Sequence, residues 1–246
     1  MTLILTRVAR DGIVMAADSA LTEKFGELAP RILHGVTKLM PHQASASCIG
    51  TWGGGVVPHP EPKKAPIAIE FVVKTFLKQA GSISSGLELV ERLAGWLGEN
   101  YCADRDFIGL DISTVRPEPG IELPAVYRLT NAETPDKKPR RFFHHRVLRA
   151  PVLYDADVDQ IIIPAGDENN AGVWVEEFHT AARHAVERTG SDPLPDEIDG
   201  LSSWLPSIVR AVSDAYQSLE IGESIGGRVT SVAMRLSDGC ISTRCT

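Results

Sequence analysis

Four residues near the start of the chain have the types and the order that amide hydrolysis by an N-terminal threonine requires: Thr2, Asp18, Lys38 and Gly50. A threonine hydroxyl attacks a carbonyl only when a base takes its proton. The α-amine of an N-terminal threonine, with an ordinary pKa of about 7.7–8.0, is such a base. Thr2 follows Met1 directly, and methionine aminopeptidases remove Met1 before small residues. We therefore expect Thr2 to be exposed without a propeptide.

The other three residues would supply the electrostatics of the reaction. Lys38 lies in the otherwise apolar stretch 36–40, where its charge would keep the amine neutral and lower the pKa of the hydroxyl. Asp18 would fix that lysine and keep it charged. Gly50, just before the glycines of 53–55, offers a backbone N–H to a tetrahedral intermediate. Taken singly, Asp18 is typical of a turn, Lys38 of an exposed strand face and Gly50 of a loop. The inference of a catalytic site therefore depends on the order and spacing of these residues.

A β-hairpin is predicted to position the first two of these residues. Residues 2–9 and 13–17 are apolar-rich runs, and Asp11-Gly12 between them is a strong hairpin signal. This hairpin would bring Asp18 back beside Thr2. Residues 20–35 are expected to be loop-like, and short strands are predicted at 36–40 and 44–52.

Further along the chain, helices alternate with strands. Apolar residues at helical spacing predict helices at 67–80, 85–101, 171–188 and 203–219, with Ser84 or Ser85 as an N-cap and Pro206 in a first turn. Strands are predicted at 107–112, 125–129, 142–147, 160–163 and 229–236, followed by a short last strand. The polar segment 132–141 suggests a solvated hairpin tip or insertion. This order predicts two sheets between two layers of helices.

The bulk properties exclude several classes of function. The chain has 246 residues, of which 43% are hydrophobic, and a net charge of −7, whereas nucleic-acid-binding domains are usually basic. No apolar run approaches the roughly 20 residues of a membrane span, and the N-terminus lacks a signal-peptide pattern. The four cysteines form no CxxC pair, which argues against a metal site. We expect a single cytoplasmic domain over 1–246 without a metal.

The N-terminal pattern resembles the proteasome β-subunit family and the related peptidase subunit of the bacterial two-component ATP-dependent protease, which are N-terminal-nucleophile hydrolases. In that family a mature N-terminal threonine opens a strand, a DG turn follows, and then V-x-A-A-D-S-x-x-T. Here Thr2, Asp11-Gly12 and the run from Ile13 to Thr22 match without a gap. The family's lysine matches Lys38, and its A-G-F-A-G-G segment matches Ile49 to Gly54.

The resemblance implies an α+β fold, a four-layer αββα sandwich, and hydrolysis of peptide or amide substrates by Thr2 in a homo-oligomeric ring. It implies no cofactor, and it names no unfoldase partner. By carry-over, Asp18 and Lys38 set the electrostatics and Gly50 donates to the oxyanion. A small apolar pocket for the residue before the scissile bond would be lined by Leu21, Val36, Met40, Cys48 and Trp52.

The supporting residues depart from the family pattern. The family's G-S-G before the third helix is replaced by Ala165-Gly166-Asp167, and its D-x-x-S-G-G by the segment 222–227. Ser19, Asp167, Glu223 and Ser224 are therefore the candidates for the supporting roles. Two alternatives stay open: a catalytically silent ring or scaffold subunit, which the missing serine favours, and a small-molecule amidase of the same superfamily.

Overall fold

A computed structural model describes the chain at residues 3–23, 31–33, 35–53, 55–57, 65–101, 108–133, 138–159, 162–166, 175–177, 180, 194–218 and 225–245. The chain forms two compact units, and each is assembled from separate segments of the sequence. The first comprises Met1–Val36, Tyr154–Arg235 and Ser242–Thr246, and the second comprises Thr37–Leu153 and Leu236–Ile241.

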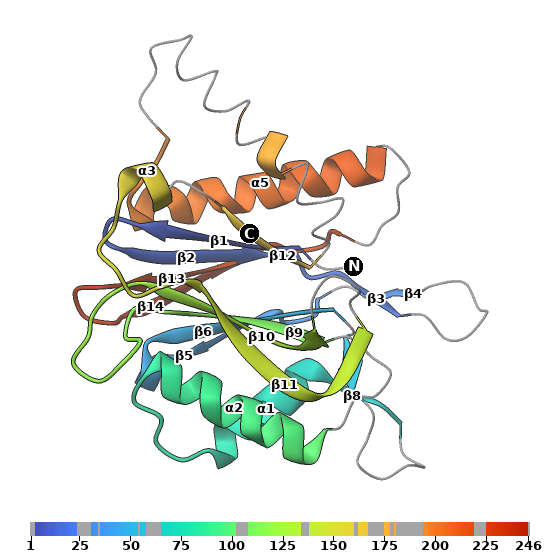
Figure 1. The fold of residues 1–246 in the computed structure, drawn as a ribbon. Coiled ribbons are helices and arrows are strands. Elements are labelled where there is room, and N and C mark those ends of the chain that lie inside the picture. Colours follow the sequence, from blue (N-terminus) through green and yellow to red (C-terminus); the bar gives the residue numbers. More distant parts are fainter. Residues whose placement is uncertain are drawn as a thin grey trace. The chain divides into compact units, whose positions relative to one another are not determined.

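The first unit is built on a five-stranded antiparallel sheet in the order β12-β1-β2-β13-β14 (Figure 1). Its strands are Ile163–Gly166, Leu3–Ala9, Gly12–Ala17, Thr230–Arg235 and Ile241–Cys245. The short helix α3, Ala156–Asp159, and the long helix α5, Ile198–Ser218, belong to this unit. Figure 1 shows α5 along one face of the sheet, and strand β13 from the end of the chain beside β2 from its start.

The core of the first unit lies between this sheet and α5. Alternate residues of β1, Leu3 and Leu5, face the helix together with Val14 of β2, as the period of two in a strand requires. On α5 the buried residues recur at helical spacing: Leu201, Leu205, Ile208, Val209 and Val212. The helix predicted over 203–219 is thus confirmed, with its start five residues earlier.

The earlier start of α5 corrects the predicted place of Pro206, which lies inside the helix and not in its first turn. Proline has no N–H, so a proline inside a helix leaves the carbonyl four residues before it without its usual donor. That carbonyl belongs to Ser202, and the hydroxyl of Ser231 on β13 donates to it at 3.5 Å. The neighbouring strand thus supplies the donor that Pro206 cannot provide.

The second unit has a five-stranded antiparallel sheet in the order β11-β10-β9-β6-β5. Its strands are Lys138–Arg149, Ala125–Glu133, Ile108–Thr114, Ser47–Gly53 and Leu39–His42. A 3₁₀ turn, η1 (Gln43–Ser45), joins β5 to β6. Two two-stranded pairings complete the described strands: β3 (Leu21–Glu23) with β4 (Arg31–Leu33) in the first unit, and β7 (Val56–Val57) with β8 (Ile67–Ala68) in the second.

Helices α1, Ile69–Gln79, and α2, Gly86–Asn100, cover one face of the second sheet (Figure 1). The oxygen of Ser85 accepts a hydrogen bond from the N–H of Glu88 at 3.3 Å, which confirms the predicted N-cap. The core between helices and sheet contains Val73, Phe76, Leu89, Leu93, Ile49, Leu110, Ile112 and Leu129. Both helices therefore form where the apolar spacing predicts them, within two residues at each end.

Several predicted elements differ from the structure. The stretch 20–35, expected to be loop-like, contains the paired strands β3 and β4. The strands predicted at 36–40 and 44–52 are β5 and β6, which begin at Leu39 and Ser47. The segment 132–141 forms the end of the β10–β11 hairpin, in agreement with the predicted hairpin tip, and the two strands extend into it as far as Glu133 and Lys138. The strand predicted at 160–163 overlaps β12 only at Ile163, where β12 begins; α3 ends at Asp159, and residues 160 and 161 lie outside the described residues. Of the helix predicted at 171–188, residues 175–177 and 180 are helical, and the remainder lies outside the described residues.

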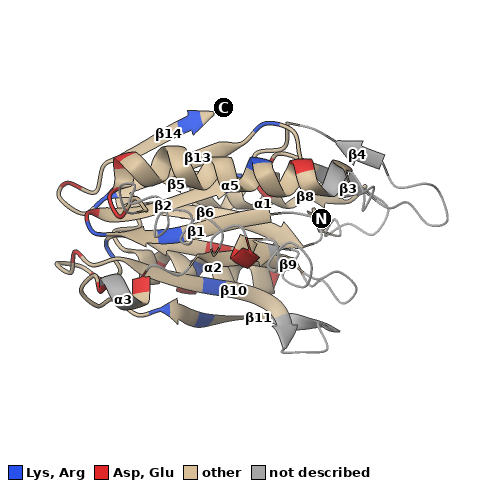
Figure 2. Ribbon diagram, turned by 90° about the horizontal axis from the view of Figure 1, so that it is seen from above, with Lys and Arg blue, Asp and Glu red and all other residues tan. Residues whose placement is uncertain are grey.

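The prediction of a mixed fold of sheets covered by helices is confirmed, and both five-stranded sheets are antiparallel. In the part of the chain that the structure describes, no helix is both long and apolar enough to cross a membrane. Charged residues are sparse along the strands in Figure 2, with blue segments inside β1 and β10.

Candidate functional site

Asp18 directly follows β2 and is almost completely buried, with 2% of its surface exposed. Its carboxylate accepts backbone hydrogen bonds from three parts of the first unit. Oδ1 accepts from the N–H of Leu3 at 2.9 Å, and Oδ2 accepts from the N–H groups of Ala20 and Gly226, each at 3.1 Å. These three donors hold the carboxylate in one orientation. Asp18 thus brings a fixed negative charge to the residue that follows Thr2.

Ser19 joins the same segments through its backbone and its hydroxyl. The Ser19 N–H donates to the carbonyl of Gly226 at 3.1 Å, and the Ser19 carbonyl accepts from the N–H of Val36 at 3.1 Å. The hydroxyl oxygen accepts from the N–H of Arg228 at 2.9 Å and from that of Gly35 at 3.4 Å. Ser19 therefore holds together the end of β2, the segment before β13 and the segment that leads to Lys38.

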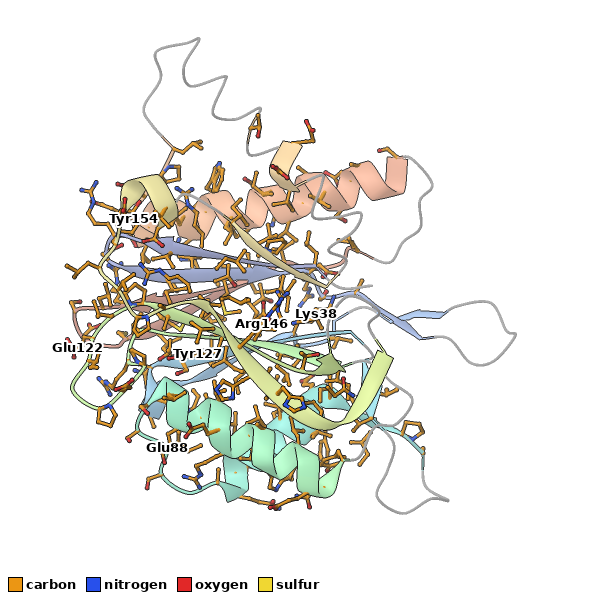
Figure 3. All side chains as sticks on the ribbon, in the orientation of Figure 1. Lys38, Glu88, Glu122, Tyr127, Arg146 and Tyr154 are labelled. Carbon is orange, nitrogen blue, oxygen red and sulfur yellow. The ribbon has the colours of Figure 1, made fainter. Side chains whose placement is uncertain are left out.

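Lys38 and Gly50 are neighbours within the second unit. Lys38 immediately precedes β5 and is buried, with 4% of its surface exposed (Figure 3). Its carbonyl accepts the N–H of Thr51 at 2.9 Å, and Gly50 lies opposite Leu39 in the β5–β6 ladder. Neighbouring residues of a strand point their N–H groups to opposite sides, so the N–H of Gly50 is directed toward β9.

Three of the five predicted pocket residues lie on the second sheet, and they occupy both of its faces. Cys48, Gly50 and Trp52 alternate along β6 on the face away from the helices. Met40 pairs with Ile49 and belongs to the core beneath the helices. Outside these strands, Val36 is half-buried, and for Leu21 only the backbone is described. Burial raises the pKa of the Cys48 thiol far above its ordinary value, so this cysteine behaves as an apolar residue.

A buried polar network next to these residues was not predicted from the sequence. Arg128 donates from Nε and Nη2 to the two carboxylate oxygens of Asp111, each at 2.8 Å. The indole N–H of Trp52 donates to Asp111 at 3.1 Å, and the Arg128 guanidinium lies over the Trp52 ring at 4.8 Å from its centre. Gly109 faces this ring, and a Cβ there would come within 2.2 Å of it. The sequence does contain a signal for this pair. Asp111 and Arg128 each lie among apolar residues of a strand, and a charged side chain buried there requires a partner of opposite charge.

The remaining predicted site residues, Thr2, Asp167, Glu223 and Ser224, lie outside the described residues. The structure therefore brings Asp18 and Ser19 together in the first unit, and Lys38 and Gly50 together in the second. Among the described residues, no three His, Cys, Asp or Glu side chains gather as a metal site.

Solved structures of proteins called Anbu have a similar fold. Anbu from Yersinia bercovieri, described as an ancestral β-subunit, matches with a TM-score of 0.55 and 11% identity over 98% of this chain and 86% of its own. A Gly-1 mutant of Anbu from Hyphomicrobium sp. strain MC1 matches with a TM-score of 0.54 and 10% identity over 100% and 86%. No protein-family model matches the sequence, and no curated protein matches it. The fold similarity fits the proteasome-like fold that the N-terminal residues predict.

Proposed function

We propose that this chain, which has the fold of the ancestral β-subunit Anbu, is a proteasome-like hydrolase that cleaves peptide or amide bonds with Thr2 after removal of Met1. The observation that carries the proposal is the position of Asp18. Its buried carboxylate accepts the N–H of Leu3 at 2.9 Å, so a fixed negative charge lies beside the peptide group that joins Thr2 to β1. The predicted hairpin, which ends in the motif Ala-Ala-Asp-Ser, places the aspartate of that motif beside Thr2.

In this mechanism the hydroxyl oxygen of Thr2 attacks the substrate carbonyl while the α-amine accepts the hydroxyl proton. The amine then donates a proton to the leaving nitrogen, which departs as the ester of Thr2 forms. A water molecule, activated by the same amine, hydrolyses that ester and restores the enzyme. The base must be neutral at the working pH, so a positive charge close to it favours the reaction.

The proposal assigns this positive charge to Lys38. Lys38 follows Val36 by two residues, and the Val36 N–H is hydrogen-bonded to the carbonyl of Ser19 at 3.1 Å. Consecutive Cα atoms are about 3.8 Å apart. The Cα of Lys38 therefore lies at most two Cα–Cα distances from that of Val36, which is hydrogen-bonded to Ser19, the residue after Asp18. A buried lysine requires a compensating negative group, and we assign the Asp18 carboxylate to that role.

The oxyanion contact is assigned to the backbone at Gly50, which a side chain does not obstruct. Since the N–H of Gly50 is directed toward β9, it would be shared between the strand ladder and the oxyanion. The pocket for the residue before the scissile bond is assigned to Val36, Cys48 and Trp52, with Leu21 as a further member. Met40 is not assigned to it, because its side chain packs in the core on the helix-facing side of the sheet. The residues Ser19, Asp167, Glu223 and Ser224 remain the proposed supporting residues.

The proposal also covers the fold and the assembly. It includes stacking of the two sheets as the inner layers of an αββα sandwich and places the protein in a cytoplasmic homo-oligomeric ring.

The test combines intact mass with turnover of fluorogenic peptides and simple amides. The wild-type protein is expected to lack Met1 and to release fluorophore. Thr2→Ala is expected to be inactive, and Thr75→Ala, at a half-buried position of α1 where the hydroxyl bonds the Phe71 carbonyl, should be fully active. Retained Met1 in the native protein, or equal turnover by Thr2→Ala, would contradict the proposal. Hydrolysis of amides without hydrolysis of peptides would favour the small-molecule amidase.

A further inference from the structure

Arg7 is a charged residue inside the apolar core of the first unit. It lies on the helix-facing side of β1 between Leu5 and Ala9, which both belong to that core. Only 1% of its surface is exposed, and its guanidinium lies 5.2 Å from the ring centre of Trp204 on α5. The catalytic proposal gives Arg7 no role.

The buried donors of Arg7 lack acceptors in the described part of the chain. Nε and Nη1 have no hydrogen-bond partner there, and neither has the hydroxyl of Tyr154, which is also buried. Tyr154 precedes α3, a helix that packs on β1 (Figure 3). Burial lowers the pKa of Arg7, whereas electrostatic interactions with Tyr154 and Asp196 raise it, so both residues lie within electrostatic range of the guanidinium.

Asp196 is an acidic residue within this range, and one of its carboxylate oxygens is bonded to another arginine; Asp159 lies within electrostatic range of Tyr154. Arg10 donates from Nη2 to Asp196 Oδ2 at 2.5 Å, and the Arg10 N–H donates to the Asp196 carbonyl at 2.8 Å. An arginine cannot lose its proton in a protein, and a buried charge without a hydrogen-bonded partner costs several kcal/mol. A water molecule would satisfy a donor but would not neutralise the charge.

We propose that Arg7 and Tyr154 form a binding site for a small oxyanion, either inorganic phosphate or a small carboxylate. The guanidinium supplies positive charge and N–H donors, the Tyr154 hydroxyl supplies a further donor, and the Trp204 ring holds the guanidinium plane. The burial of Arg7 restricts the ligand to a small anion. Bound there, the anion links β1, the strand that begins after Thr2, to the segment before α3.

The experiment is a thermal-unfolding titration of the full chain with sodium phosphate, sodium acetate and sodium chloride at matched ionic strength. A ligand that binds the folded state raises Tm by about 5–10 °C at one hundred times its Kd for a chain of this size. We expect a saturable rise with phosphate or acetate. The shift should be lost in Arg7→Met and reduced in Tyr154→Phe. It should be unchanged in Arg210→Met, which removes an exposed positive charge from α5.

The two oxyanion arms distinguish the sources of the ligand. A rise with phosphate alone identifies a phosphate site, and a rise with acetate alone identifies a carboxylate site. Equal shifts with all three salts, or the same shift in Tyr154→Phe and Arg210→Met as in the wild type, would overturn the proposal. Tyr154→Phe changes no charge and no strand residue, so it remains informative if Arg7→Met does not fold.

Discussion

Replacing Asp18 by asparagine tests the hydrogen-bonding centre of the first unit. Asparagine has nearly the same shape, but it presents one acceptor oxygen where aspartate presents two. Oδ1 of Asp18 accepts the N–H of Leu3, and Oδ2 accepts those of Ala20 and Gly226. In either orientation of the new side chain, its NH₂ group faces one or two backbone donors. Those N–H groups are then buried without an acceptor.

The magnitude follows from these contacts. Each buried donor left without a partner costs about 1–3 kcal/mol, and the bonds that remain lose the contribution of a charged acceptor. We expect Asp18→Asn to lower the free energy of unfolding by about 2–4 kcal/mol. For a chain of this size that corresponds to a fall in Tm of about 5–15 °C.

The assay is urea denaturation of the wild type, Asp18→Asn and a control, Asp199→Asn. Asp199 also carries a carboxylate in the first unit, but its side chain is 76% exposed and is paired with Arg235 at 2.8 Å. Exposed pairs of this kind contribute up to about 1 kcal/mol. If Asp18→Asn is no more destabilising than Asp199→Asn, the carboxylate does not hold β1 and β13 as described.

Three further predictions concern the second unit. Arg128→Met leaves the fully buried Asp111 carboxylate without its guanidinium partner, so it should lower the free energy of unfolding in urea by about 3–5 kcal/mol. Gly109→Ala places a Cβ 2.2 Å from the Trp52 ring, and this overpacking should cost about 1–3 kcal/mol and change the intrinsic tryptophan fluorescence. Because burial raises the pKa of Cys48, its thiolate is scarce at pH 8, and peptide mass mapping should find it unlabelled by iodoacetamide until urea unfolds the protein. Rapid labelling of native Cys48 would contradict the packing of β6.

The opening hairpin was predictable because its signals are local. The apolar runs and the Asp11-Gly12 pair indicate two antiparallel strands, and the structure has β1 and β2 in that arrangement. The role of Gly12 was not predictable. Gly12 is paired with Ala9 as a strand residue, and a Cβ there would lie 2.0 Å from the carbonyl oxygen of Met234 on β13. The glycine is required by a strand that arrives more than two hundred residues later in the chain.

Element boundaries beyond the hairpin depended on tertiary contacts. The prediction that Pro206 begins its helix followed from the preference of proline for a first turn. Residues 198–202 extend the helix because Ile198 and Leu201 pack in the core, and because the Asp11 carboxylate accepts the N–H of Ile198 at 2.8 Å. Such a distant cap cannot be recognised from local sequence.

The same distinction applies to the site. Asp18 was found because the motif around it is contiguous, and its three backbone contacts agree with a fixed charge near the start of β1. Asp111 and Arg128 were missed because they are separated in sequence and meet only through the pairing of β9 with β10. Each is a charged residue surrounded by apolar neighbours in its strand. Two such residues of opposite charge predict a buried ion pair.

The central claim is that Thr2 is an N-terminal nucleophile, and its most direct test is labelling with a peptide epoxyketone followed by mass mapping. An epoxyketone reacts stably with a residue that offers both a free α-amine and a hydroxyl. We predict one adduct per chain, located on an N-terminal peptide that begins at Thr2, and no adduct in Thr2→Ala. An unlabelled wild-type protein that begins at Thr2, or an adduct at any other residue, would contradict the claim and favour the silent scaffold subunit.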